Sequence, residues 1–236
     1  MGPLIDAHRG ECGVPGLPAA DRYNRAIAMG VDFVEIDVRR TADGAYVNFH
    51  DHRIPSGGAL RNLTYAALKD ELGDDLLTVE ELLEIVDGRS GLHVDVKEAG
   101  YEAEIVPIIQ AGCGHSDVVF TGGDGSIRAI KERFPTVRVG LTLGDDLDGA
   151  PPWRSLRVRL SELFPGVRLR RCQADFAAAH ERLARLRVLD HCARAHMPAW
   201  VWTVDEEPDV ARFMRDPRVA VLITNRPDIA MRIRKA

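Results

Sequence analysis

Short apolar segments alternate with longer amphipathic segments along the chain, and this alternation restricts the fold more than any other feature. It is typical of βα units, whose strands form a parallel sheet. We expect strands at Leu4–His8, Asp32–Val38, Tyr46–His50, Leu92–Lys97, Asp117–Thr121, Val137–Leu141, Arg168–Gln173, Ala199–Val204 and Val219–Thr224. We expect helices at Ala19–Met29, Thr78–Val86, Tyr101–Gln110, Ser126–Phe134, Ala178–His196, Glu206–Met214 and Pro227–Arg234, with a loop from Gly144 to Pro165.

The expected strands are one too many for an eight-stranded barrel. The connection Arg39–Gly44 is too short for a parallel crossover and ends in an Asp-Gly turn signal, so Tyr46–His50 is interpreted as a hairpin partner of the strand before it. Eight parallel strands remain. We therefore predict an α/β fold, a (β/α)₈ TIM barrel with a small β-hairpin after the second barrel strand, and interpret residues 1–236 as a single domain.

Composition excludes several classes of protein. The net charge is -5, and no run of Lys or Arg forms a basic tail, which argues against nucleic acid as a partner. Cys12, Cys113, Cys172 and Cys192 are too scattered for a zinc cage or a disulfide framework, which favours a reducing compartment. Neither a secretory leader nor a transmembrane segment is indicated, so we expect a cytoplasmic protein.

Polar and charged residues alternate with apolar ones inside two of the expected strands, Asp32–Val38 and Leu92–Lys97. Side chains on a strand alternate between its faces, so Glu35 and Asp37 share one face, and so do His93, Asp95 and Lys97. The apolar face must meet the helices, and the charged face therefore points into the barrel. Carboxylates converging there are costly to desolvate and require a cation or paired partners.

The types and positions of these residues indicate metal-assisted phosphate chemistry. Glu35, Asp37 and Asp95 form an all-oxygen ligand set suited to one divalent ion, Mg²⁺ or Ca²⁺. The alternative is a buried ion-pair network with Lys97 and Arg9.

Two histidines lie where acid and base catalysts are expected. His8 ends the first strand, and the hairpin returns His50 to the same rim, so the pair is predicted to act as general base and general acid on either side of a phosphorus atom. His52 is the alternative to His50. Arg9 and Lys97 supply positive charge for a phosphate. Trp202 is interpreted either as an apolar wall beside the leaving group or as barrel core.

These residues occur in motifs that resemble those of the glycerophosphodiester phosphodiesterase family, part of a superfamily of phospholipase-C-like TIM-barrel phosphodiesterases that includes sphingomyelinase D. The motifs, in order, are His8-Arg9-Gly10, Glu35-Ile36-Asp37-Val38, Thr41-Ala42-Asp43-Gly44, His50-Asp51, Asp95-Val96-Lys97, Trp202-Thr203-Val204 and Thr224-Asn225-Arg226-Pro227. The resemblance implies a metal-dependent barrel that hydrolyses small glycerophosphodiesters to sn-glycerol 3-phosphate and an alcohol. It implies that His8 and His50 are the acid/base pair, that Glu35, Asp37 and Asp95 hold the metal, and that Arg9 and Lys97 contact phosphate.

The chain departs from the family pattern at two places. Pro15–Ala20 replaces the Pro-Glu-Asn-Thr segment that usually follows His-Arg-Gly, and Asp95 stands where glycerophosphodiesterases usually have Glu, as in the sphingomyelinase D branch. The head group of the substrate, the choice between Mg²⁺ and Ca²⁺ and the oligomeric state stay open. The alternatives are cleavage of lysophospholipids of the phospholipase D type, with hydrolysis or a cyclic phosphate as the outcome, a Schiff-base reaction at Lys97, and a degenerate barrel that only binds a phosphorylated ligand.

Overall fold

The computed structural model describes residues 2–144, 158, 160–162 and 164–235. Its strands are β1 (Leu4–Ala7), β2 (Phe33–Arg40), β3 (Tyr46–Asn48), β4 (Gly91–Val96), β5 (Val118–Gly122), β6 (Arg138–Leu143), β7 (Phe176–His180), β8 (Ala199–Trp202) and β9 (Val219–Thr224). Its α-helices are α1 (Ala19–Ala28), α2 (Tyr65–Leu72), α3 (Val79–Val86), α4 (Glu102–Gly112), α5 (Asp124–Arg133), α7 (Gly166–Cys172), α8 (Glu181–Leu183), α9 (Leu189–Arg194), α10 (Glu207–Phe213) and α11 (Pro227–Lys235). Shorter helical turns are η1 (His8–Gly10), η2 (Leu60–Asn62), η3 (Gly73–Asp75) and the π-helical η4 (Ala184–Val188).

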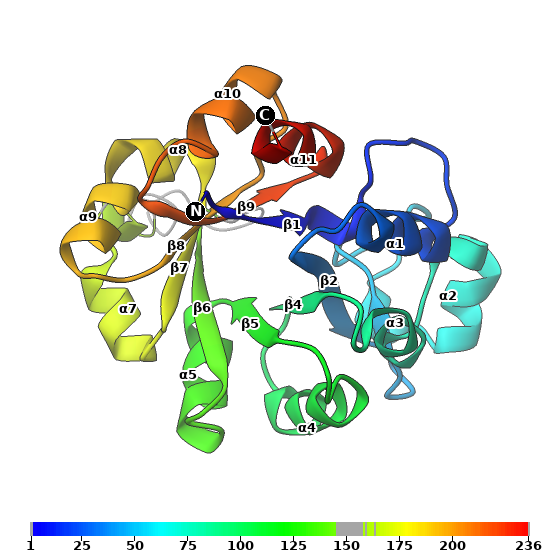
Figure 1. Ribbon diagram of the computed structural model, residues 1–236. Coiled ribbons are helices and arrows are strands. Elements are labelled where there is room, and N and C mark those ends of the chain that lie inside the picture. The colour runs from blue at the N-terminus through cyan, green and yellow to red at the C-terminus, as the bar shows by residue number, and fades with distance from the viewer. Residues whose placement is uncertain (1, 145–157, 159, 163, 236) are drawn as a thin grey trace.

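The parallel strands close into a barrel surrounded by helices, as Figure 1 shows. Within the described residues the sheet runs in the order β1-β9-β8-β7-β6-β5-β4-β2-β3, and β1 also pairs with β2, which closes the ring. β3 is antiparallel and pairs with β2 outside the ring. The predicted (β/α)₈ barrel and its hairpin are confirmed.

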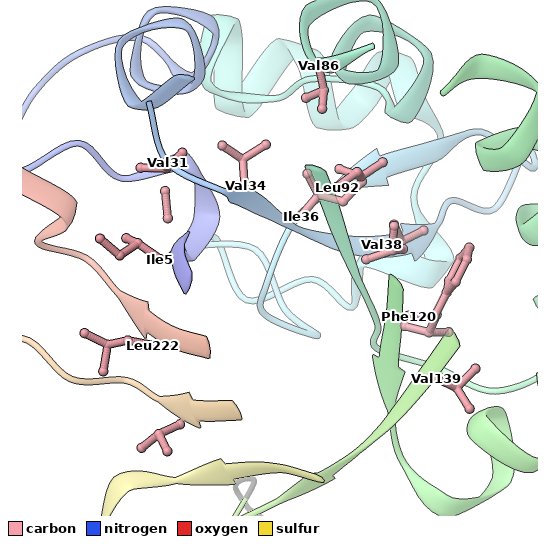
Figure 2. Packing of buried hydrophobic residues seen from close by; sticks show 14 of the residues in the cluster. Ile5, Val31, Val34, Ile36, Val38, Val86, Leu92, Phe120, Val139 and Leu222 are labelled. Carbon is pink, nitrogen blue, oxygen red and sulfur yellow. The ribbon is translucent and has the colours of Figure 1, made fainter. Parts of the chain in front are cut away.

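The apolar faces of the strands pack against the helices, as the alternation predicts. Val34, Ile36 and Val38 of β2 are fully buried, and Figure 2 shows Val34 lying below Val86 of α3. The polar residues between them, Glu35 and Asp37, are consequently turned into the barrel. The main hydrophobic core is therefore the layer between the strands and the helices.

The segment after β3 has a smaller hydrophobic cluster of its own. Its buried members are Val47, Ile54, Leu60, Leu68 and Leu76, which form a group separate from the main core. The helix α2 that supplies Leu68 was absent from the sequence prediction. This cluster supports the chain that carries His50.

The sequence prediction was wrong between residues 166 and 180. Arg168–Gln173, expected as a strand, lies in helix α7 and its C-cap, and strand β7 occupies Phe176–His180, whose last residues were expected to begin a helix. Alternation of Arg168, Leu169 and Arg170 imitates a strand, while Ala177–Ala179 have high helix propensity. Tertiary packing overrides both local signals, since the free edges of β6 and β8 require a strand between them.

Other boundaries follow local chemistry. The predicted capping box is present at the start of α3, where the side chain of Thr78 accepts from the amide of Glu81 and the side chain of Glu81 accepts from the amide of Thr78. The predicted loop Gly144–Pro165 lies largely outside the described residues. Among the described helices, none combines the length and apolarity required to cross a lipid bilayer.

A glycine on β6 tests the corrected position of β7. Gly140 pairs with Phe176, and a Cβ added at Gly140 would lie 2.1 Å from Cε2 of the Phe176 ring. We expect Gly140→Ala to lower the free energy of unfolding by about 1–3 kcal/mol, because the ring must shift in a packed interior. Chemical denaturation measures this, with Gly125→Ala in α5 as the control, since nothing lies within 4 Å of the added carbon there. Equal stability of the two variants would contradict this packing of β7.

Candidate active site

A cavity of about 510 Å³ opens in the barrel and gathers the predicted site residues. Its lining residues are His8, Arg9, Glu35, His50, His93, Asp95, Lys97, Thr121, Thr142, Ala178, Trp202, Thr203 and Ile223. Asp37 lies directly behind this lining, in contact with Arg9 and Lys97. The structure thus brings together all eight predicted residues, which come from η1, β2, β8, the end of β4 and the segment after β3.

Three carboxylates converge at the floor of the cavity. One oxygen from each of Glu35, Asp37 and Asp95 lies within 4.8 Å of the others. Pairing of β2 with β4 causes this convergence, because Asp37 is aligned with Asp95 in the sheet. Lys97 Nζ lies 2.9 Å from Asp37 Oδ1 and 2.6 Å from Asp95 Oδ2.

The charges of this cluster are only partly balanced. Burial and the nearby charge of Asp37 raise the pKa of Glu35 well above its ordinary value. Burial opposes ionisation of Asp95 too, but the charge of Lys97 and hydrogen bonds from Lys97 and Thr121 lower its pKa. Lys97 and its neighbours thus lower the pKa of both aspartates, whereas at Glu35 burial and the charge of Asp37 outweigh the charge of Lys97.

This donor set fits a hard divalent cation. Such ions prefer carboxylate oxygens, and a positive charge beside Glu35 would relieve the repulsion that raises its pKa. Glu35, Asp37 and Asp95 are the residues that would hold the ion.

His8 is oriented by two residues whose roles sequence reasoning missed. Asn225 Nδ2 donates to Asp205 Oδ2 over 2.7 Å, which turns Asn225 Oδ1 toward His8 Nδ1 at 2.8 Å. His8 therefore carries its proton on Nδ1 and presents Nε2 as an acceptor. Burial, followed by the charge of Arg9, lowers the pKa of His8, so the ring is a neutral base at neutral pH.

His50 is placed by the hairpin and by Arg39. The Nε and Nη2 atoms of Arg39 donate to the His50 carbonyl over 3.0 and 2.7 Å, and Nη1 forms an ion pair with Glu98 at 2.7 Å. The Nδ1 atom of the His50 ring contacts Asp51 Oδ1 at 2.6 Å. His52 is absent from the cavity lining, so the geometry favours His50 over the alternative histidine.

The turn that bears His8 and Arg9 is braced by Tyr23 of α1. Gly10 has φ +64°, and a Cβ there would overlap the Tyr23 ring at 2.5 Å, so only glycine fits. The Tyr23 hydroxyl donates to the Glu35 carbonyl over 2.9 Å. Arg9 also has a positive φ, 52°, and its amide donates to Glu35 Oε2 over 2.8 Å.

Trp202 forms part of the apolar side of the cavity. Its Nε1 donates to the Ala178 carbonyl over 3.0 Å. This hydrogen bond to the protein satisfies the single polar group of the Trp202 side chain. The indole ring therefore offers an apolar surface to whatever occupies the cavity. The methyl group of Ala178 and the side chain of Ile223 extend this surface.

Comparison with known proteins gives the same family throughout. The profile of the Glycerophosphoryl diester phosphodiesterase family matches residues 19–106. A probable glycerophosphodiester phosphodiesterase 2 of Mycobacterium tuberculosis is 28% identical, over 97% of this chain and 89% of its own length. A glycerophosphodiester phosphodiesterase of Caldanaerobacter subterraneus is 25% identical, over 97% of this chain and 96% of its own. The chain is thus similar in sequence to glycerophosphodiester phosphodiesterases over nearly its whole length.

Solved structures of phosphodiesterases share the fold. A putative glycerophosphoryl diester phosphodiesterase from Agrobacterium tumefaciens superposes with a TM-score of 0.81 at 20% identity, covering 100% of this chain and 98% of the other. A phosphodiesterase from Oleispira antarctica, solved with the product sn-glycerol-3-phosphate, superposes with a TM-score of 0.75 at 16% identity and covers 100% of this chain and 98% of that one. The glycerophosphodiester phosphodiesterase family is one of phosphoric diester hydrolases, so the chain is an enzyme of that class.

Proposed function

We propose that the chain hydrolyses small glycerophosphodiesters to sn-glycerol 3-phosphate and an alcohol, with His8 and His50 as base and acid and with one divalent cation, Mg²⁺ or Ca²⁺. The observation that carries the proposal is the convergence of both histidines, Lys97 and the carboxylate cluster on one cavity. The product bound to the Oleispira antarctica enzyme supports the glycerol 3-phosphate moiety. We extend the proposal to residues 1–236 as one catalytic domain acting in the cytoplasm, where its four cysteines, all free, stay reduced.

The hydrogen bonds of the residues support the roles that we propose for them. His8 Nε2 accepts the proton of the attacking hydroxyl, because Asn225 already occupies Nδ1. His50, paired with Asp51, gives a proton to the departing alkoxide. Arg9 and Lys97 bind and orient the phosphate oxygens. A cation held by the three carboxylates would supply Lewis-acid stabilisation of the charge that develops on phosphorus oxygens.

The structure weakens one alternative chemistry at Lys97. A Schiff-base lysine needs a lowered pKa, so that its amine is neutral. Burial acts in that direction, but Asp95 and Asp37 outweigh it and raise the pKa of Lys97. An ammonium group held in this way is suited to binding phosphate.

A second candidate function is favoured by one residue. Asp95 occupies the position where the family usually has Glu, as in the sphingomyelinase D branch. The second candidate is therefore phospholipase D-type cleavage of lysophospholipids at the same site. A degenerate barrel that only binds a phosphorylated ligand is disfavoured, because both histidines and all three carboxylates line or adjoin the cavity.

A substrate panel tests the proposal. Purified protein is incubated with glycerophosphocholine, glycerophosphoethanolamine, glycerophosphoglycerol and lysophosphatidylcholine, with Mg²⁺, Ca²⁺ or EDTA, and the products are identified by phosphorus NMR. We expect glycerol 3-phosphate from the water-soluble diesters and none after chelation. Release of lysophosphatidate or a cyclic phosphate from the lysolipid alone would support the second candidate. Binding without turnover of any compound would overturn both.

A further inference from the structure

A chain of hydrogen-bonded side chains crosses the interior of the barrel beneath the carboxylate cluster. It runs from Asp6 on β1 to His93 on β4, on to Thr121 on β5, and ends at Asp95. We propose that Thr121, held by His93 and Asp6, is a positioning residue that sets the Asp95 carboxylate for cation binding. This inference rests on the cation site of the proposed function.

All three contacts between these hydrogen-bonded side chains are short. Asp6 Oδ2 lies 2.6 Å from His93 Nδ1, and His93 Nε2 lies 2.7 Å from Thr121 Oγ1. Thr121 Oγ1 lies 2.7 Å from Asp95 Oδ1. These side chains are buried, and the His93 ring is also packed edge-on against Trp200 with the ring centroids 5.2 Å apart. This network is therefore a fixed part of the barrel interior, and His93, Thr121 and Asp95 also line the cavity.

The available hydrogens determine which group donates and which accepts in each of these hydrogen bonds. Thr121 has a single hydroxyl hydrogen, which an ionised Asp95 needs as a donor because a carboxylate only accepts. Thr121 must then accept from His93 Nε2, so His93 donates at that nitrogen. His93 Nδ1 shares a proton with Asp6 Oδ2. Each hydrogen bond thus depends on the one before it. Asp6 orients His93, and His93 in turn orients the Thr121 hydroxyl so that it donates to Asp95.

Both oxygens of Asp95 are consequently held. Thr121 holds Oδ1 and Lys97 holds Oδ2, at 2.7 and 2.6 Å. Lys97 also contacts Asp37, so without Thr121 the carboxylate could rotate toward the ammonium group and away from the other two acids. An aspartate is one methylene shorter than a glutamate and reaches less far into the cavity, so its orientation decides whether it joins Glu35 and Asp37 around an ion. Partners of this kind tune metal affinity by about 10–100-fold when they are removed from other sites.

The test measures cation affinity directly. The probe is Mn²⁺, followed by electron paramagnetic resonance of the free ion, with calorimetry as a second measurement. We expect Thr121→Val, which keeps the shape and removes the hydroxyl, to weaken Mn²⁺ binding by about 10–100-fold. Thr121→Ser, which keeps the hydroxyl, should bind within about threefold of the wild type, a difference too small to indicate a lost partner.

A matched control lies on the neighbouring strand. Thr142 lines the same cavity, and its buried Oγ1 has no hydrogen-bond partner within the described part of the chain. Thr142→Val should leave Mn²⁺ affinity unchanged, which separates a general loss of polarity from loss of the contact to Asp95. Thermal unfolding in EDTA identifies any variant that is merely misfolded.

The upstream links are tested by a double variant, Asp6→Val with His93→Phe, which avoids leaving a buried carboxylate without its partner. We expect this double variant to bind Mn²⁺ more weakly than the wild type. Adding Thr121→Val to it should weaken binding no further than Thr121→Val does alone, because the three residues act through one contact to Asp95.

The outcomes separate this inference from the proposed function. Wild-type Mn²⁺ affinity in Thr121→Val, or an equal loss in Thr142→Val, would overturn the positioning role and leave the cation site intact. Failure of the wild-type protein to bind Mn²⁺ at all would overturn the cation site itself, and the positioning role with it.

Discussion

Replacing His50 by alanine is expected to lower kcat/KM for an alkyl glycerophosphodiester by about 10²–10⁴-fold and to leave cleavage of a p-nitrophenyl diester nearly unchanged. An alkoxide leaves only when it is protonated, whereas p-nitrophenolate leaves without a proton. The ring of His50 lines the cavity, and its Nδ1 is paired with Asp51, so Nε2 is the nitrogen available to the leaving group. Steady-state kinetics with both substrates on one preparation measure the difference.

His8→Ala should lose both activities, because the attacking hydroxyl needs a base whatever the leaving group. His52→Ala is the matched control, since this residue is exposed and absent from the cavity lining. Rescue of His8→Ala in place of His50→Ala would exchange the two roles. Rescue of neither would mean that both histidines chiefly bind phosphate, and loss in His52→Ala alone would identify His52 as the acid.

Glu35→Gln and Asp37→Asn are expected to lower activity by orders of magnitude and to change stability in opposite directions. Both remove a charged ligand of the proposed cation site. In EDTA, burial and Asp37 raise the pKa of Glu35, so ionising it destabilises the fold and Glu35→Gln should raise Tm. Burial opposes ionisation of Asp37 too, but Lys97 and Arg9 lower its pKa, so Asp37→Asn should lower Tm.

The pH dependence of Tm in EDTA checks the sign. A raised folded-state pKa means that stability is lost as pH rises from 4.5 through the higher pKa of Glu35, and Glu35→Gln should abolish that loss. A lowered pKa means that the contribution of Asp37 is present above pH 3.8 and is lost as pH falls, so Asp37→Asn should matter least in acid. Equal Tm changes in the two variants, or full activity after chelation, would contradict a cation site built from these acids.

The acidic cluster and the barrel could be predicted because both follow from strand periodicity. Glu35 and Asp37 lie between buried valine and isoleucine residues, and a period of two leaves only the barrel interior for their side chains. The same reasoning placed Asp95 and Lys97. His50 required one further step, the interpretation of Tyr46–His50 as a hairpin, and pairing of β3 with β2 confirms it.

The residues that orient the site could not be predicted in the same way. Asn225 is 217 residues from His8, and Thr121 is 26 residues from Asp95, so no local pattern connects either pair. Asp205 is the first of three consecutive acids after β8, and no periodic signal distinguishes it from Glu206 and Glu207. The exchange of helix and strand around β7 has a related cause, since neighbouring strands decide that segment and local propensity does not.

The separate hydrophobic cluster behind the hairpin leads us to expect that the two halves of the site differ in local stability. The acids lie on strands of the barrel, whereas His50 belongs to a segment that has its own small core and is joined to the barrel by the β2–β3 pairing and the Arg39 contacts. A segment of this kind opens at lower free energy than the domain around it. If His50 is the proton donor that we propose, brief opening of this segment would withdraw it while the substrate stays in the barrel. We therefore expect turnover to depend more strongly than substrate affinity on the fraction of molecules in which residues 46–77 are closed.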